Sequence, residues 1–402
     1  MTHRKCFALC FILIALIDPW GPPPRAADPS GSHDQSIPNL KASQEIVAFE
    51  WTGEQIPYPP PAPGDDVRLL GPIMDYYKKA GYQIHGDTFP MTWAGDDEIY
   101  TSTGDPSWGG KNYGLDIEKF TGMPPHYTIT RINPMNDYQG GGGLGTKPTG
   151  MICVRGVLYL AFQNLLGFKP PAYGTKSQHG DDAAIVRSLD YGKTWFPEMS
   201  QIKEPMFPGN RFGGPAFVNF GRDNANARDT YVYAVSTEQF DNGSHLRLGR
   251  VPADHILDKA AWEWVAELRP GAAPRWTKDL TEAIPIFSDD RHISLPDMVY
   301  LAPINRYLLL TFKFHRDLSP THGSTLYIYD APEPWGPFTL VHSEEQWESK
   351  EVNPYCPRLP LKWIQKAPDG ITGWFQFSGS WRPNSLQYRS HIRTFKIRVR
   401  HP

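Results

Sequence analysis

The hydrophobic pattern of this chain is a succession of short apolar runs separated by polar corners rich in glycine and proline. From Phe89 onward one rhythm recurs: an apolar run, a tight corner, a second apolar run, and then a less regular pair. Short runs with turn signals between them are typical of β-strands. The leading hairpins are predicted at Phe89–Trp93 with Glu98–Thr103, Gly150–Val154 with Val157–Gln163, Ala216–Phe220 with Thr230–Ser236, Met298–Ala302 with Arg306–Phe314, and Leu359–Trp363 with Thr372–Ser378.

Five similar units indicate radial repetition. The predicted fold is all-β, a five-bladed β-propeller of four-stranded antiparallel blades. A double-sheet sandwich is the alternative, but it does not explain why a hairpin is followed by a second, shorter pair such as Ala184–Arg187 with Thr194–Pro197. Two helices are predicted, Leu69–Ala80 and Pro252–Val265.

The N-terminal segment has the pattern of a secretory signal. Arg4 and Lys5 precede the apolar stretch Phe7–Ile17, and Arg25-Ala26-Ala27 follows a proline-rich segment. The apolar stretch is too short to cross a bilayer as a helix, so no membrane association is predicted. We expect a signal peptide at 1–27, a disordered leader at 28–48 and one propeller domain at 49–402, in a secreted or periplasmic protein.

Composition narrows the function classes. A formal charge of −3 and a pI near 6.5 exclude a strongly basic surface, so nucleic acid is not an expected partner. The 40 prolines, 36 glycines and 13% aromatic residues favour strands and tight turns. Removal of the signal leaves Cys153 and Cys356, which form either one bridge or, as the favoured reading, two buried free thiols.

One turn carries a specific motif. Residues 188–195, SLDYGKTW, resemble the S-x-D-x-G-x-T-W Asp-box of sialidase-like propellers at every fixed position. Asp190 can accept hydrogen bonds from backbone amides, and Gly192 supplies a positive φ. We therefore assign Asp190 a structural role. The resemblance implies that this turn joins a third to a fourth strand on the face away from the substrate, here called the lower face.

Strand alternation then places other residues on the opposite, upper face. Asp87 and Asp105 flank the first hairpin, and because their numbers sum to 192, a turn centred on Asp96 would set them opposite each other. Opposed residues lie about 5 Å apart, and two such carboxylates suffice to hydrolyse a glycosidic bond. The alternative reading is that both aspartates only cap loops.

Other predicted upper-face residues could bind a substrate. Trp108 and Trp381 are expected to stack on sugar rings, and the polar candidates are Lys147, His179, Asp182, Arg211 and His292. No cofactor is predicted. A calcium ion held in the channel by His179, Asp181 and Asp182 is a minor alternative.

The chain resembles a family of secreted bacterial propellers catalogued as a domain of unknown function, some of whose members are glycoside hydrolases acting on D-arabinan. The carrying segments are FPMTWAGDDEIYTSTGD, TKPTGMICVRGVLYLAFQN, RSLDYGKTW, FGGPAFVNFG, DTYVYAVS, RVPADHILD, AWEW and YIYDAPEPWGPF. The resemblance implies a catalytic acid pair at positions Asp87 and Asp105. The chain departs from the family at Gly104-Asp105-Pro106, where relatives have Gly-Asp-Gly, and at SDDRHISLPDMVY.

The predicted function is therefore a carbohydrate-active protein, a glycoside hydrolase whose partner is a polysaccharide or oligosaccharide. One alternative is a polysaccharide lyase, for which Tyr355, His292, His315 and Arg211 would matter instead. The other is a propeller that binds carbohydrate without cleaving it.

Overall fold

A computed structural model describes residues 41–57, 86–106, 115–135, 145–165, 180–315, 323–348, 352–380 and 388–400. In this part of the chain the regular structure is β-strand and short 3-10 helix, with no α-helix, which confirms the all-β prediction. No helix in these ranges is both long and apolar enough to cross a membrane. The predicted signal peptide and the predicted helix Leu69–Ala80 lie outside the described residues.

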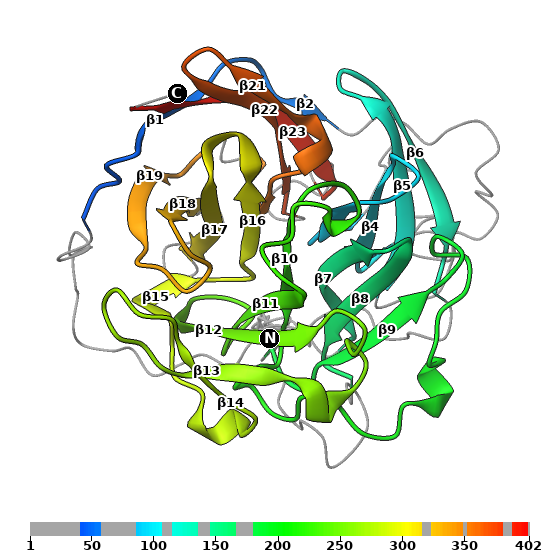
Figure 1. Ribbon diagram of the computed structural model, residues 1–402. Coiled ribbons are helices and arrows are strands. Elements are labelled where there is room, and N and C mark those ends of the chain that lie inside the picture. Colours follow the sequence, from blue (N-terminus) through cyan, green and yellow to red (C-terminus); the bar gives the residue numbers. More distant parts are fainter. Residues whose placement is uncertain are drawn as a thin grey trace, which may run out of the picture. The chain divides into compact units, whose positions relative to one another are not determined.

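The strands pair into antiparallel groups that follow chain order (Figure 1). The first group is β3 (Met91–Trp93), β4 (Ile99–Gly104), β5 (Leu115–Met123) and β6 (His126–Asn133), and the second is β7 (Lys147–Val154), β8 (Val157–Gln163) and β9 (Ala184–Ser188). The third is β10 (Ala216–Asn219), β11 (Tyr231–Thr237), β12 (Gly243–Pro252), β13 (Glu263–Glu267) and β14 (Arg275–Thr277), with β15 (Phe287–Ile293) on β12.

Two further groups complete the set. The fourth is β16 (Asp297–Leu301), β17 (Arg306–Phe314), β18 (Ser324–Ala331) and β19 (Thr339–Glu345). The fifth is β20 (Tyr355–Arg358), β21 (Ile364–Ala367), β22 (Gly370–Ser378) and β23 (Ser390–Val399), completed by β1 (Ile46–Trp51) and β2 (Ile56–Pro57). Short 3-10 helices lie between strands: η3 (Met199–Gln201), η4 (Arg222–Asn224), η5 (Lys259–Ala261), η6 (Leu280–Glu282), η7 (Ala302–Ile304) and η8 (Leu361–Trp363).

The first strands of successive groups lie next to one another. β3 contacts β7, β7 contacts β10, β10 pairs in parallel with β16, and β16 contacts β20. The last group also contacts the first, since Arg358 Nε donates to Thr88 O at 2.8 Å and Thr88 N–H donates to Ser378 Oγ at 3.1 Å. The segment that precedes β3 is thus held by the C-terminal part of the chain.

The strands read as continuous apolar runs because both faces of each group are packed. In β8, Leu158, Leu160 and Phe162 join the apolar cluster shared with the first group. The alternate residues Tyr159 and Ala161 join the cluster shared with the third group. The core is therefore divided into separate clusters between neighbouring groups, each filled from two sides.

The Ser188–Trp195 turn is held by its own side chains. Asp190 accepts hydrogen bonds from the backbone N–H of Thr194 at 2.9 Å and from its hydroxyl at 2.7 Å. Gly192 has a φ of 90° and donates its N–H to Ser188 Oγ at 2.8 Å. The hydrogen bonds that Asp190 forms with the described residues all lie within the turn, which accords with a structural role.

Two predicted elements are wrong. Pro252–Val265 is not helical: Pro252 ends β12, η5 is one short turn, and β13 begins at Glu263. Burial of Trp262 and Trp264 between two strand groups overrides the local helix preference. The predicted strand Leu359–Trp363 is replaced by β20 and η8, because Pro360 has no N–H to continue a ladder.

The N-terminal boundary also differs from expectation. β1 begins at Ile46, inside the segment expected to be a disordered leader, and pairs with β23 from Ile46 to Trp51. Burial of Ile46 and Phe49 against the fourth and fifth groups accounts for the order.

Candidate active site

The hairpin of β3 and β4 has the predicted register. Met91 pairs with Thr101 and Trp93 with Ile99, so the turn is centred on Asp96 as expected. Asp96 and the following acid therefore lie at the closed end of the hairpin. Asp87 and Asp105 lie at the open end.

A bulge separates Asp87 from that register. Thr88 and Phe89 both have positive φ, 69° and 42°, and Phe89 N–H donates to Asp87 O at 3.0 Å. The extra residue makes Asp87 pair with Gly104 instead of Asp105, through two backbone hydrogen bonds of 2.9 and 2.8 Å. The expectation that the aspartates are directly opposed is thus wrong by one residue, because a bulge adds a residue to one strand only.

The Asp87 carboxyl group is buried, with 8% of the residue exposed. Its Oδ2 accepts a hydrogen bond from the Tyr355 hydroxyl at 2.5 Å, and its Oδ1 has no hydrogen-bond partner among the described residues. Burial, followed by the negative charge of Asp105, raises the pKa of Asp87 from 3.8 to about 7, against the opposing effects of Tyr355, Lys147 and Tyr388. Near neutral pH this carboxyl group can therefore carry a proton.

Asp105 has a different environment. Its Oδ1 lies 2.8 Å from Nζ of Lys147, which is fully buried, while 22% of the Asp105 side chain is exposed. Asp105 thus has a cationic partner and access to solvent, whereas Asp87 forms no ion pair in the described part of the chain. Two neighbouring carboxyl groups with unequal surroundings are the arrangement that acid–base chemistry requires.

Tyr355 and Tyr388 form the buried wall behind Asp87. Both pack with Phe312 and Phe314 in one apolar cluster, where the rings of Phe314 and Tyr355 are 5.2 Å apart between centroids. The sequence analysis did not select Tyr388. Tyr388 lies two residues before β23, in a segment that no motif marks in the sequence.

Among the predicted substrate-binding residues that the structure describes, Lys147 alone forms an ion pair with a member of this acid pair. Lys147 contacts Asp105, as described. Asp182 is fully buried and its Oδ1 accepts the N–H of Gly209 at 2.9 Å, and Arg211 donates from Nη1 to Ala283 O at 3.2 Å. Three others, Trp108, His179 and Trp381, lie outside the described residues.

His292 belongs to a separate buried network. Its Nδ1 is 2.6 Å from Asp289 Oδ1, and its Nε2 is 3.1 Å from Lys313 Nζ. Tyr329 donates its hydroxyl to Asp289 Oδ2 at 2.8 Å. Lys313 and Tyr329 were not selected from the sequence, because they become neighbours of His292 and Asp289 only where β15 packs with β17 and β17 pairs with β18.

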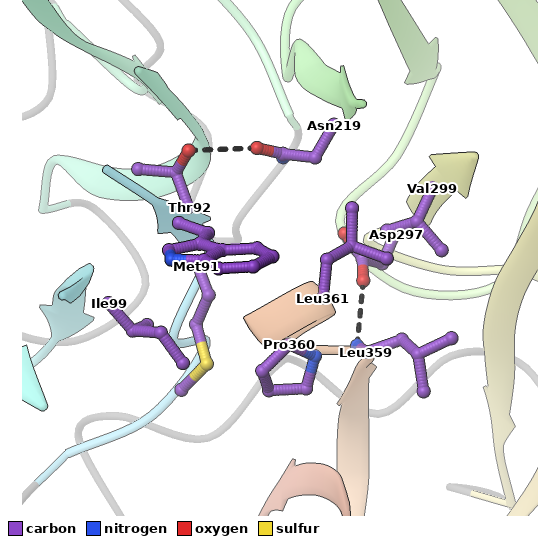
Figure 2. Close-up of a pocket in the computed structure, with 10 residues that line it drawn as sticks. Met91, Thr92, Ile99, Asn219, Asp297, Val299, Leu359, Pro360 and Leu361 are labelled. Carbon is purple, nitrogen blue, oxygen red and sulfur yellow. Dashed lines mark hydrogen bonds between the residues drawn. The ribbon is translucent and has the colours of Figure 1, made fainter. Parts of the chain in front are cut away.

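A pocket lies beside β3 (Figure 2). It is lined by Met91, Thr92, Trp93, Ile99, Asn219, Asp297, Val299, Leu359, Pro360 and Leu361. Its polar groups are already paired: Thr92 donates its hydroxyl to Asn219 at 2.9 Å, and Asp297 accepts the N–H of Leu359 at 3.0 Å. The pocket contains neither member of the acid pair.

Metal binding has no support from the described residues, where no three His, Cys, Asp or Glu side chains group together. His179, one member of the calcium alternative, lies outside them. Cys153 and Cys356 are both buried free thiols, as favoured from the sequence.

Comparison with solved structures finds similar chains at low identity. The α-L-arabinofuranosidase PaAbf62A from Podospora anserina is 14% identical, with a TM-score of 0.45, over 88% of this chain and 99% of that one. The GH62 α-L-arabinofuranosidase catalytic domain from Coprinopsis cinerea is 12% identical, with a TM-score of 0.46, over 89% and 100%. The endo-arabinase from Bacteroides thetaiotaomicron is 10% identical, with a TM-score of 0.40, over 80% and 95%. Structural similarity at this level does not assign an activity to this chain.

Comparison with curated proteins finds no match. The profile of a family described as "Domain of unknown function (DUF4185)" matches residues 70–349.

Proposed function

Because the chain belongs to the DUF4185 family, whose description assigns no activity, its function must be argued from its own site, and we propose that it is a glycoside hydrolase acting through Asp87 and Asp105. The observation that carries the proposal is the unequal environment of these two neighbouring carboxyl groups. One is buried with a pKa raised to about 7, and the other is ion-paired with a buried lysine.

In this proposal Asp87 is the general acid. Its raised pKa lets it hold a proton at neutral pH and release it to the leaving glycosidic oxygen. Asp105, the more exposed carboxylate, acts as the base that activates water or as the nucleophile. Lys147 holds Asp105 in place and balances its charge.

The fold proposal that accompanies this function is a five-bladed propeller. Support comes from the strand groups that begin with β3, β7, β10, β16 and β20, whose first strands contact one another in that order. Pairing of β1 with β23 would close the last blade with the N-terminal strand. The upper mouth of the channel would then hold the acid pair, and export would follow from the N-terminal signal pattern.

The two alternatives find less support. A lyase that used Tyr355 as its base would need a readily ionised phenol, but burial raises the pKa of Tyr355 well above 10, and its hydroxyl is donated to Asp87. His292 is held between Asp289 and Lys313. A purely binding protein would gain nothing from a buried carboxyl group with a strongly raised pKa.

The test is hydrolysis of a panel of polysaccharides that includes D-arabinan, the substrate suggested by the family resemblance. Asp87→Asn and Asp105→Asn should each reduce the release of reducing ends at least about 100-fold, the lower range for loss of a general acid or base. Asp254→Asn is the matched control, because Asp254 is exposed and forms an ion pair with exposed Arg155. Full activity in both site variants would refute the proposal, and an unsaturated product absorbing in the ultraviolet would indicate a lyase.

A further inference from the structure

Arg247 is a partly buried arginine whose side chain forms no ion pair or hydrogen bond with the described residues. It lies on β12 between Leu246 and Leu248, whose side chains fill the core on one face, so Arg247 points to the other face. Its Nε and Nη1 are buried and make no hydrogen bond. Unpaired buried donors of a cation are costly, so their retention calls for an explanation.

A second arginine lies close to it. The segment that follows Ala283 runs along β12, with Ile286 N–H donating to Leu246 O at 2.8 Å. Arg211 Nη1 donates to Ala283 O in this segment. Burial lowers the pKa of Arg247, and the charge of Arg211 lowers it further. Two guanidinium groups therefore repel each other on the same face of β12.

Two neighbouring acids lie within range of the arginine charges: the charge of Glu238 opposes the lowering of the Arg247 pKa, and Arg211 acts on Asp279. Glu238 accepts backbone N–H groups of Ser244 at 2.7 Å and His245 at 3.0 Å. Asp279 caps η6 by accepting the N–H of Thr281 at 2.8 Å. Neither forms an ion pair with Arg211 or Arg247 in the described part of the chain, so these acids leave the buried donors of Arg247 without an acceptor.

The arginine pair connects to the acid pair through buried polar groups. Arg247 is opposite Ser236 on β11, and Ser236 Oγ accepts the N–H of Gly214 at 3.1 Å. A Cβ on Gly214 would lie 3.3 Å from Oε1 of Gln163, so the side-chain amide of Gln163 lies next to the Gly214 backbone. Gln163 is fully buried, and neither of its amide atoms has a hydrogen-bond partner among the described residues.

Gln163 connects this polar region to the acid pair. It is paired across the β7–β8 hairpin with Lys147, the partner of Asp105. Residues directly opposite in a hairpin share one face. Unpartnered donors of Gln163 and Arg247 thus line one region that begins at the Asp105–Lys147 ion pair.

We propose that Arg211 and Arg247 form a subsite for the anionic group of an acidic glycan, either a uronate carboxylate or a sulfate ester. Gln163 lies between this subsite and the acid pair and donates to a glycan hydroxyl. The anion would accept hydrogen bonds from the N–H groups of Arg247 that lack an acceptor. Its negative charge would also offset the repulsion between the two arginines. The placement beside Asp105 rests on the proposed function, whereas the binding itself does not.

The test is calorimetric titration of the full chain with three oligosaccharides of equal length: a galacturonate, a sulfated galactan and a neutral galactan. At least one acidic probe should bind about tenfold more tightly than the neutral one, since a hydrogen bond to a charged group contributes about that factor. Arg247→Gln and Arg211→Gln should each remove most of this advantage and leave neutral binding unchanged. The comparison between the two acidic probes identifies the anion.

Arg155→Gln is the control, because Arg155 is exposed and forms an ion pair with exposed Asp254. Two variants are used so that a folding defect in one leaves the other informative, with thermal melting as the check.

Equal binding of acidic and neutral probes, or full acidic affinity in both variants, would overturn the subsite. If Asp105→Asn abolishes hydrolysis while the acidic probes show no advantage, only the subsite fails. If the arginine effect stands while Asp105→Asn stays active, only the hydrolase proposal fails.

Discussion

Gly104 leaves the space that the Asp87 carboxyl group occupies. A Cβ atom at residue 104 would lie 2.5 Å from Asp87 Oδ1, which is closer than any relaxed contact of these atoms. The glycine is therefore required by the approach of a side chain. Its removal should affect the acid pair before it affects the rest of the fold.

If Asp87 is the general acid, as proposed, we predict that Gly104→Ala lowers hydrolysis at least about tenfold, because the added methyl group must displace the Asp87 carboxyl group, and small misplacements of this kind carry large rate losses. Gly95→Ala, at the closed end of the same hairpin, is the control: its Cβ would meet nothing nearer than 3.4 Å. Rates and melting temperatures of the two variants make the comparison. Unchanged activity in Gly104→Ala would contradict the assigned role of Asp87.

The raised pKa of Asp87 predicts how stability depends on pH. The folded protein binds this proton more tightly than the unfolded chain does, since the pKa is about 7 in the fold against 3.8 for a free side chain. The stabilisation is complete below about pH 4 and is lost as the pH rises towards 7, by about 1.4 kcal/mol per pH unit at most. Asp87→Asn should remove this decrease. Urea unfolding of both proteins between pH 4 and 8 measures it, and parallel curves would disprove the shift.

Tyr355→Phe should move the pH profile of the reaction. The hydrogen bond from Tyr355 lowers the pKa of Asp87, so its loss raises that pKa. The descending limb of the rate profile should therefore shift to higher pH, because the acid keeps its proton longer. Tyr300→Phe, which loses only an exposed hydrogen bond to Asn305, is the control. A shift to lower pH would argue against Asp87 as the acid.

Arg358 holds the bulge that carries Asp87. It is 1% exposed and donates to Thr88 O at 2.8 Å and to Pro296 O at 3.1 Å. Arg358→Lys cannot make both bonds, and we expect it to lower the free energy of unfolding by about 2–4 kcal/mol. Arg398→Lys, in an exposed pair with Glu50, should change it by less than about 1 kcal/mol. Denaturant titration distinguishes the two, and equal effects would show that the bulge does not depend on Arg358.

The sequence by itself determined the all-β class, most hairpins and the register of the first one. These features follow from local patterns: β7–β8 and β16–β17 are apolar runs joined by short corners, and the corner at Asp96 fixes which residues pair. Asp87 and Asp105 could be selected for the same reason, since both flank that hairpin. The error of one residue between them arose because nothing local predicts left-handed Thr88 and Phe89.

Only the tertiary structure decided the chemistry of the pair. Tyr355 reaches Asp87 from 268 residues away, Lys147 belongs to another strand group than Asp105, and Arg358 holds the bulge from the C-terminal part of the chain. Alternation and turn chemistry act over a few residues, and they cannot specify which distant strands become neighbours. The burial that raises the pKa of Asp87 exists only when the first and last strand groups pack together.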